Sequence, residues 1–183
     1  MPYFLPSYNF SRKNNSFRTI IAHSFAFVKT NLRFNEKYCE KKIKISTTES
    51  CTGGFLAGTI VNVSGASEVF DEGYITYSNA AKHKILGVKE ETLEQYGAVS
   101  EETAKEMAEG CAKAACAQIA IGITGIAGPT GGTKEKPVGL VYMGCFYQGT
   151  AKVKRFIFSG DRSQVRKQSV EEALKFILER LEE

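Results

Sequence analysis

The stretch Thr48-Glu49-Ser50-Cys51-Thr52-Gly53-Gly54 follows a short apolar run and sets the expectation for the fold. The apolar run predicts a strand. The two glycines predict a tight turn, because glycine adopts backbone dihedrals that a Cβ forbids. Apolar residues after the glycines predict a helix. A strand, a glycine turn and a helix present either a nucleophilic side chain or a row of free N–H groups, so this stretch is a candidate site.

The remaining sequence continues the alternation of strands and helices. Strands are predicted at residues 42–47, 68–77, 118–124, 138–147 and 150–158, and helices at 54–63, 78–86, 100–116 and from 161 or 163 to 181. The segment 118–124 is almost wholly apolar, which is typical of a strand covered on both faces. The pattern predicts one α/β domain, a three-layer α/β/α sandwich with a mixed β-sheet.

Composition restricts the class of protein. The 183 residues are 43% hydrophobic and 24% charged, which is ordinary for a soluble globular chain. No apolar run approaches the roughly 18 to 20 residues that span a bilayer, so we expect no membrane partner. The five cysteines are odd in number and form no CxxC pair, which indicates free thiols in a reducing compartment. We expect neither a metal nor a cofactor.

The basic charge is confined to the beginning of the chain. Residues 1–45 hold nine lysines and arginines against two glutamates, a net charge of +7, whereas the remainder carries −3. The globular part therefore offers no general field for nucleic acid. Residues 1–16 read as a disordered or loosely attached leader, and an amphipathic helix is expected from 16 to about 40, within a domain at 17–183. The expected location is cytoplasmic; the alternative is an organelle transit peptide, since no acidic residue precedes Glu36.

Four clusters of polar residues and glycines follow predicted strands, where ligands usually bind in open α/β sheets. They occupy residues 49–54, 77–82, 124–136 and 159–162, with Arg166 one turn beyond the last. The cluster 124–136 has no Walker spacing, although its glycines are suited to presenting N–H groups to an anion or an amide. A flexible surface loop is the alternative interpretation of that cluster.

Ser50 is a candidate nucleophile if a base removes its proton. Histidines are scarce, and His83 is adjacent to Lys82 on a predicted helix, so only one of the two is expected to face Ser50. A Ser–Lys pair is the more economical arrangement, with Tyr77 relaying or orienting the proton. It requires a substantially neutral and therefore partly buried Lys82.

Other readings of these residues stay open at this level. Cys51 is a rival nucleophile, expected to be partly thiolate at the mouth of a helix. Ser50 or Thr52 alternatively serves only as the cap of the following helix. Arg162, at a helix start, is suited to gripping a phosphate. A solvated helix face is the alternative for Arg162 and the preferred reading for Arg166.

Taken in order, the motifs closely resemble the C-terminal domain family of the competence-damage-inducible protein CinA. They are Glu-Ser-Cys-Thr-Gly-Gly (49–54), Gly-Tyr-Ile-Thr-Tyr-Ser-Asn-x-x-Lys (73–82), Gly-Ala-Val-Ser (97–100), Gly-Ile-Ala-Gly-Pro-x-Gly-Gly (125–132) and Phe-Ser-Gly-Asp-Arg (158–162). The resemblance runs from about residue 43 to 181. Stand-alone members of the family include nicotinamide mononucleotide deamidases.

The resemblance implies hydrolysis of the carboxamide of nicotinamide mononucleotide to nicotinate mononucleotide and ammonia, without a metal, by a chain that associates as a homodimer or a higher homo-oligomer. Ser50 is implied as the nucleophile and Lys82 as its general base, with Tyr77 assisting. The residues expected to bind substrate are Thr52, Gly53, Gly54, Asn79, Thr124, Gly125 and Arg162. Two competing functions are a nucleotide-binding or regulatory module without chemistry and an amidase or esterase for another phosphorylated small molecule.

Overall fold

The computed structural model describes residues 43–183, so the predicted leader and the helix at 16–40 lie outside the described residues. Five strands form one mixed sheet in the order β2-β1-β3-β4-β5. β1 pairs in parallel with β2 and β3, while β3–β4 and β4–β5 are antiparallel. The strands are β1 (Ile45–Glu49), β2 (Phe70–Ile75), β3 (Ile119–Gly125), β4 (Leu140–Tyr147) and β5 (Thr150–Ile157). The carboxyl ends of β1, β2 and β3 therefore meet at one edge of the sheet.

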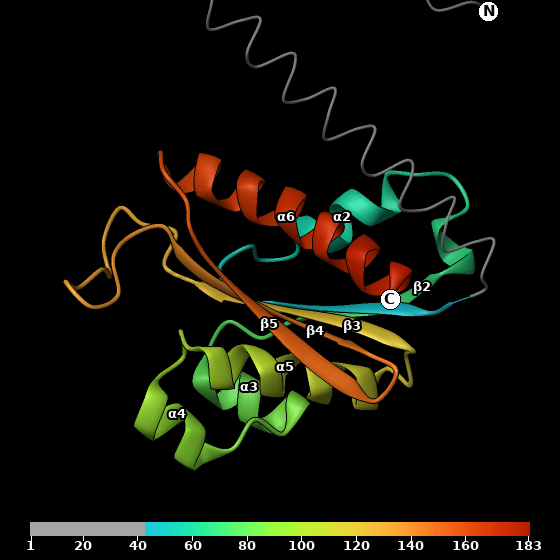
Figure 1. Cartoon of the computed structure of the whole chain (residues 1–183), viewed down its shortest axis with the longest axis horizontal. Helices are drawn as coiled ribbons and strands as arrows, with labels where there is room; N and C mark the ends of the chain where they lie inside the picture. The colour runs from blue at the N-terminus through green and yellow to red at the C-terminus, as the bar shows by residue number, and fades with distance from the viewer. Residues whose placement is uncertain (1–42) are drawn as a thin grey trace, which may run out of the picture.

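Helices cover both faces of the sheet and complete the three predicted layers (Figure 1). Two helices lie on one face, α2 (Phe55–Val61) and α6 (Arg162–Glu182). The opposite face carries α3 (Asn79–Leu86), α4 (Glu90–Tyr96) and α5 (Glu101–Ala114). The three-layer α/β/α prediction with a mixed sheet is confirmed.

The elements predicted after residue 41 are all present, with ends displaced by at most three residues. The prediction missed α4 and a 3₁₀ turn at Ala66–Glu68. The helix α4 has only seven residues, of which Thr92 and Leu93 are buried, so it is too short to show a helical period. Val61, at the end of α2, lies outside the core: it is 56% exposed because short α2 buries one face only.

The central strand β3 separates two cores by the alternation of its side chains. Ile119, Ile121 and Ile123 pack in the cluster that contains the apolar residues of α6. The intervening Ala120 packs with residues of α5. A Cβ on Gly122 would lie 2.9 Å from the backbone nitrogen of Ala108, so the missing side chain lets α5 approach the sheet closely.

Glu49 determines how α2 begins. Its carboxylate is buried and accepts hydrogen bonds from the backbone N–H groups of Gly54 (3.1 Å), Leu56 (3.0 Å) and Ala57 (2.8 Å). These donors belong to the first turn, which has no earlier carbonyl to bind. No side chain at the N-cap position, Gly54, serves this purpose. The carboxylate at the end of β1 therefore fixes the start of α2 relative to the sheet.

A methyl group at residue 144 tests the close contact between α5 and β4. In Gly144→Ala the new Cβ would lie 2.2 Å from the carbonyl oxygen of Ala104, so we expect the free energy of unfolding to fall by about 1–3 kcal/mol. Gly58→Ala is the matched control, since a Cβ there meets nothing within 4 Å; a gain of roughly 0.5–1 kcal/mol is expected inside a helix. Urea denaturation measures both, and equal effects would contradict the packing described.

Replacing the carboxylate of Glu49 tests its role at the start of α2. Glu49→Gln keeps the size but turns an NH₂ group toward backbone donors, so we expect a loss of about 1–3 kcal/mol in unfolding free energy. Glu68→Gln, on the exposed side chain of the 3₁₀ turn, is the control and should have little effect. Unchanged urea denaturation of Glu49→Gln would show that the three hydrogen bonds do not stabilise the fold.

Candidate active site

Ser50 lies directly after β1, where the chain turns into α2. Its N–H donates to the carbonyl of Ile123 in β3 at 2.9 Å, which ties the turn to the centre of the sheet. The turn then passes through Gly53 (φ +58°) and Gly54 (φ +90°), conformations that L side chains rarely adopt. The Ser50 residue is 8% exposed. The two predicted glycines are thus needed to bring the chain around a nearly buried hydroxyl.

Lys82 is the fourth residue of α3, and its side chain extends to Ser50. Ser78 caps this helix by accepting a hydrogen bond from the N–H of Ala81. The Lys82 side chain is fully buried, and its Nζ lies 3.2 Å from Ser50 Oγ. Nζ also donates to the carbonyl oxygens of Thr76 (2.9 Å) and Tyr77 (3.1 Å). The structure therefore brings together the serine and the lysine that lie 32 residues apart in the sequence.

All three partners of the Lys82 amine are uncharged, a hydroxyl and two carbonyls. Burial lowers the pKa of Lys82 below its ordinary value of 10.5, and the nearby Cys51 acts in the opposite direction. No carboxylate is among its hydrogen-bond partners, so burial of the ammonium is uncompensated by an ion pair. Burial therefore shifts the equilibrium of Lys82 toward the neutral amine, the form that accepts a proton.

The side chain of His83, the neighbour of Lys82, does not point toward Ser50. Its Nδ1 lies 2.8 Å from the carbonyl oxygen of Val88, and its Nε2 is 3.8 Å from the carboxylate of Glu90. The histidine is an exposed residue of α3. Of the two adjacent basic residues, the lysine is therefore the one that meets Ser50.

Tyr77 and Asn79 lie at the rim of this arrangement. Tyr77 contacts Lys82 through its backbone carbonyl, while its side chain is 63% exposed. Asn79 is an exposed residue at the start of α3. Thr76, the residue before Tyr77, is buried. Its hydroxyl oxygen is 3.0 Å from that of Thr48, and its carbonyl oxygen accepts a hydrogen bond from Lys82 Nζ.

Cys51 does not have the environment of a reactive thiol. The residue is buried, and that burial raises the pKa of its thiol to about 11, although Arg162 and Arg166 act in the lowering direction. The expectation of a partly ionised thiol at the helix mouth was wrong, because desolvation outweighs the nearby positive charges.

The two arginines in the first turns of α6 contact different loops. Arg162 donates from Nη1 to the carbonyl of Gly128 at 2.9 Å, and Arg166 from Nη2 to the carbonyl of Thr52 at 2.7 Å. The solvated reading of Arg166 was therefore wrong. Asp161 caps α6, since its side chain accepts from the N–H of Gln164. The first turn of α6 thus already binds one carboxylate of the chain itself.

The remaining predicted binding residues line the turn and the end of β3. Thr124 is buried, and its hydroxyl donates to the carbonyl of Ala98 at 2.6 Å. A Cβ on Gly125 would lie 2.7 Å from the carbonyl oxygen of Leu140, so this glycine permits close strand contact. Thr52 is also buried, and its hydroxyl has no hydrogen-bond partner among residues 43–183.

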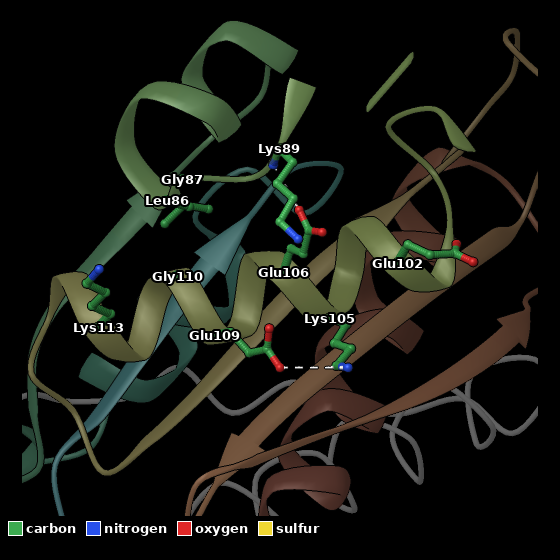
Figure 2. Close-up of a pocket in the computed structure, with 9 residues that line it drawn as sticks. All are labelled: Leu86, Gly87, Lys89, Glu102, Lys105, Glu106, Glu109, Gly110 and Lys113. Atoms are coloured by element: carbon green, nitrogen blue, oxygen red, sulfur yellow. Dashed lines mark hydrogen bonds and ion pairs between the residues drawn. The ribbon is translucent and has the colours of Figure 1, made fainter. Parts of the chain in front are cut away.

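Two hollows differ in their relation to the Ser50 turn. One of about 340 Å³ adjoins the turn and is lined by Gly53, Gly54, Phe55, Ser163, Arg166 and Lys167. A larger one, of about 460 Å³, lies between residues 86–89 and α5 and includes none of the predicted site residues (Figure 2). There Glu106 already binds the N–H of Lys89 and the hydroxyl of Thr92, and Lys105 faces Glu109. The smaller hollow therefore adjoins the glycine turn after Ser50, while Ser50 itself is not among the residues that line it.

Two further classes of site were searched for between residues 43 and 183. No group of three His, Cys, Asp or Glu side chains there is arranged to hold a metal ion. None of the helices in that range combines the length and the apolarity required to cross a bilayer.

The roles of three residues in the site were not predicted from the sequence. Thr76 acts through its backbone carbonyl, which carries no side-chain signal. Arg166 was assigned to solvent, although a basic residue one turn after Arg162 lies on the same side of a helix and gave a usable signal. No role as a helix cap was predicted for Glu49, and its position just before the glycine turn is the feature that would have indicated one.

Comparison with known proteins agrees with this architecture. The family model described as the CinA C-terminal domain matches residues 29–181. A CinA-like protein of Kosmotoga olearia is 59% identical over 135 residues, which is 74% of this chain and 33% of that protein. The chain thus spans about a third of the length of this curated relative.

Solved structures give the same result. The competence/damage inducible protein CihA from Agrobacterium tumefaciens has a TM-score of 0.83 and 37% identity, covering 85% of this chain and 96% of that one. A CinA superfamily protein from Escherichia coli has a TM-score of 0.80 and 34% identity, covering 85% and 90%. On the family match, the identities and the shared fold, this chain belongs to the CinA C-terminal domain family.

Proposed function

We propose that this chain is an amidohydrolase that converts nicotinamide mononucleotide and water into nicotinate mononucleotide and ammonia through an acyl-enzyme on Ser50. The observation that carries the proposal is the buried contact between Lys82 Nζ and Ser50 Oγ, at 3.2 Å. This distance is within the range in which a base takes a proton from a nucleophile. The choice of substrate rests on the family resemblance.

The surroundings of Lys82 favour its action as a base. A neutral amine has two N–H donors and one lone pair. The carbonyls of Thr76 and Tyr77 accept both N–H groups, at 2.9 and 3.1 Å, and the third direction at Nζ faces Ser50 Oγ. In the neutral form the lone pair therefore points at the serine hydroxyl, which donates to it.

The reaction balances with these two side chains and one water. Lys82 takes the proton of Ser50 as Oγ bonds to the carboxamide carbon and the carbonyl π electrons move to its oxygen. The resulting oxyanion collapses, the C–N bond breaks, and the lysine ammonium returns its proton to the departing amine, which leaves as ammonia. Lys82 then removes a proton from water as the hydroxide bonds to the ester carbon, and the Lys82 ammonium returns that proton to Ser50 Oγ as the ester C–O bond breaks. This restores the neutral lysine and the serine, and the carboxylic acid product loses its proton to solvent.

Groups around the turn suit the charges of this reaction. Within residues 43–183 the N–H groups of Cys51 and Thr52 donate to no other residue, and that of Cys51 interacts only with its own thiol, so both are candidate donors for the oxyanion. One such donor contributes about 3–4 kcal/mol to the transition state. On α6, Arg162 is an exposed cation that fits the phosphate of the nucleotide.

Substitution of the two adjacent candidate nucleophiles tests the proposal. Ammonia release from nicotinamide mononucleotide, measured with EDTA present, should fall by about 10³-fold or more in Ser50→Ala with little change in binding. Cys51→Ala should retain activity near that of the unaltered protein, since the thiol is buried and protonated.

The reverse pattern, with Ser50→Ala active and Cys51→Ala inactive, would move the nucleophile to Cys51. Binding of the nucleotide without ammonia release by any form would favour a binding module or another substrate.

The pH dependence tests the state of Lys82. The base must be neutral, so kcat/KM should rise with pH and level off above the pKa of Lys82. Because burial lowers this pKa, the midpoint of the rise should lie below 10.5. In Lys82→Arg the side chain stays charged, so kcat/KM should not rise to the high-pH plateau of the unaltered protein. A midpoint at or above 10.5 in the unaltered protein would contradict a lysine base in this environment.

A further inference from the structure

Arg166 makes a specific contact with the backbone of the nucleophile turn. Its Nη2 donates to the carbonyl oxygen of Thr52 at 2.7 Å, and the N–H of Phe55 binds the same oxygen at 3.2 Å. The guanidinium also lies over the ring of Phe55, with Cζ 5.8 Å from the ring centroid. Its Nε is buried and has no partner within the described residues. The bond to Thr52 is thus the polar contact by which α6 reaches this turn.

A chain of hydrogen bonds connects this contact with Ser50. The carbonyl of Thr52 and the N–H of Gly53 belong to one planar peptide group. That N–H donates to the carbonyl of Ser50 at 3.2 Å. A cation at one end of a peptide group polarises it and strengthens the bond at the other end. Arg166 therefore stabilises the position of the Ser50 carbonyl without touching Ser50.

The orientation of the Ser50 carbonyl determines that of the next N–H group. The peptide bond between Ser50 and Cys51 is trans, since the one cis bond within residues 43–183 is Gly128–Pro129. In a trans peptide the N–H points opposite to the carbonyl. The carbonyl faces Gly53, so the N–H of Cys51 points away from the turn and donates to no other residue of the described range; its one interaction there is with the thiol of its own side chain.

We propose that Arg166 is a positioning residue, which holds the peptide groups between Ser50 and Gly53 so that the Cys51 N–H receives the developing oxyanion. The inference rests on the proposed function, because it assigns the oxyanion donor of that reaction. The positive charge acts through two peptide groups and does not need to touch the substrate.

Lys167 provides a matched control for charge. It is the next residue of α6, is exposed, and lines the same 340 Å³ hollow. It forms no hydrogen bond with the turn in the described part of the chain. Lys167→Met therefore removes one positive charge from the same region without altering the peptide chain that leads to Cys51.

The experiment compares Arg166→Met, Arg166→Lys and Lys167→Met in the full chain. In assays of ammonia release from nicotinamide mononucleotide, kcat of Arg166→Met should fall by about 10- to 100-fold, with KM nearly unchanged. This loss is smaller than the loss expected when an oxyanion donor is removed altogether, because the Cys51 N–H is still present. Arg166→Lys should recover part of the loss. Lys167→Met should keep kcat, because Lys167 lines the hollow without contacting the turn, so removal of its charge can change only KM. Thermal denaturation of each variant checks that the fold is retained.

A second readout separates this inference from the proposed substrate. A fluorophosphonate reacts with an activated serine and needs the same oxyanion donor, and intact mass reports the rate at which Ser50 is labelled. If the unaltered protein is labelled but releases no ammonia, the proposed substrate is wrong, and slower labelling of Arg166→Met still supports the positioning role.

Three results would overturn the inference. One is labelling and turnover of Arg166→Met at the rate of the unaltered protein. Another is a rise in KM with kcat preserved, which would make Arg166 a binding residue for the phosphate. The third is a protein in which neither label nor ammonia appears, since no activated Ser50 would then exist for Arg166 to support.

Discussion

The buried amine of Lys82 is the interaction on which the rest of the site depends. It lies between the hydroxyl of Ser50 and the carbonyls of Thr76 and Tyr77, with no carboxylate among its hydrogen-bond partners. A charged ammonium in such a place is strongly disfavoured unless it is paired. The same burial that makes the lysine costly to protonate makes it useful as a base. Burial and reactivity are therefore two consequences of one arrangement.

The sheet topology creates this arrangement. β1 and β2 are parallel neighbours, so their carboxyl ends place Ser50 and Thr76 at the same edge, and α3 returns Lys82 between them. Glu49 fixes the start of α2, and Arg166 binds the turn from α6. Helices on both faces thus hold a turn of a few residues. The catalytic geometry of the proposed reaction follows from packing on both sides of the sheet.

The sequence alone was sufficient for the parts of this account that have local signals. The glycine turn, the helix that begins near Ser78 and the apolar β3 each follow from neighbouring residues. The helical angle between adjacent positions predicted that only one of Lys82 and His83 faces Ser50. The Thr76 carbonyl, the Glu49 cap and the Arg166 contact were missed. Backbone acceptors have no residue signature, and Arg166 lies 114 positions from Thr52, so that contact exists only through the fold. The partners, the substrate and residues 1–42 stay predictions.

The most direct test of the central claim is the titration of Lys82 itself. Lysine side chains labelled with ¹³C at Cε report protonation by NMR, and the signal of Lys82 is identified by its disappearance in Lys82→Arg. The account predicts that this one signal titrates below 10.5 and moves when Ser50 is replaced by alanine. A Lys82 signal that titrates at or above 10.5 would show that the amine stays charged, and the Ser50–Lys82 mechanism would then be wrong.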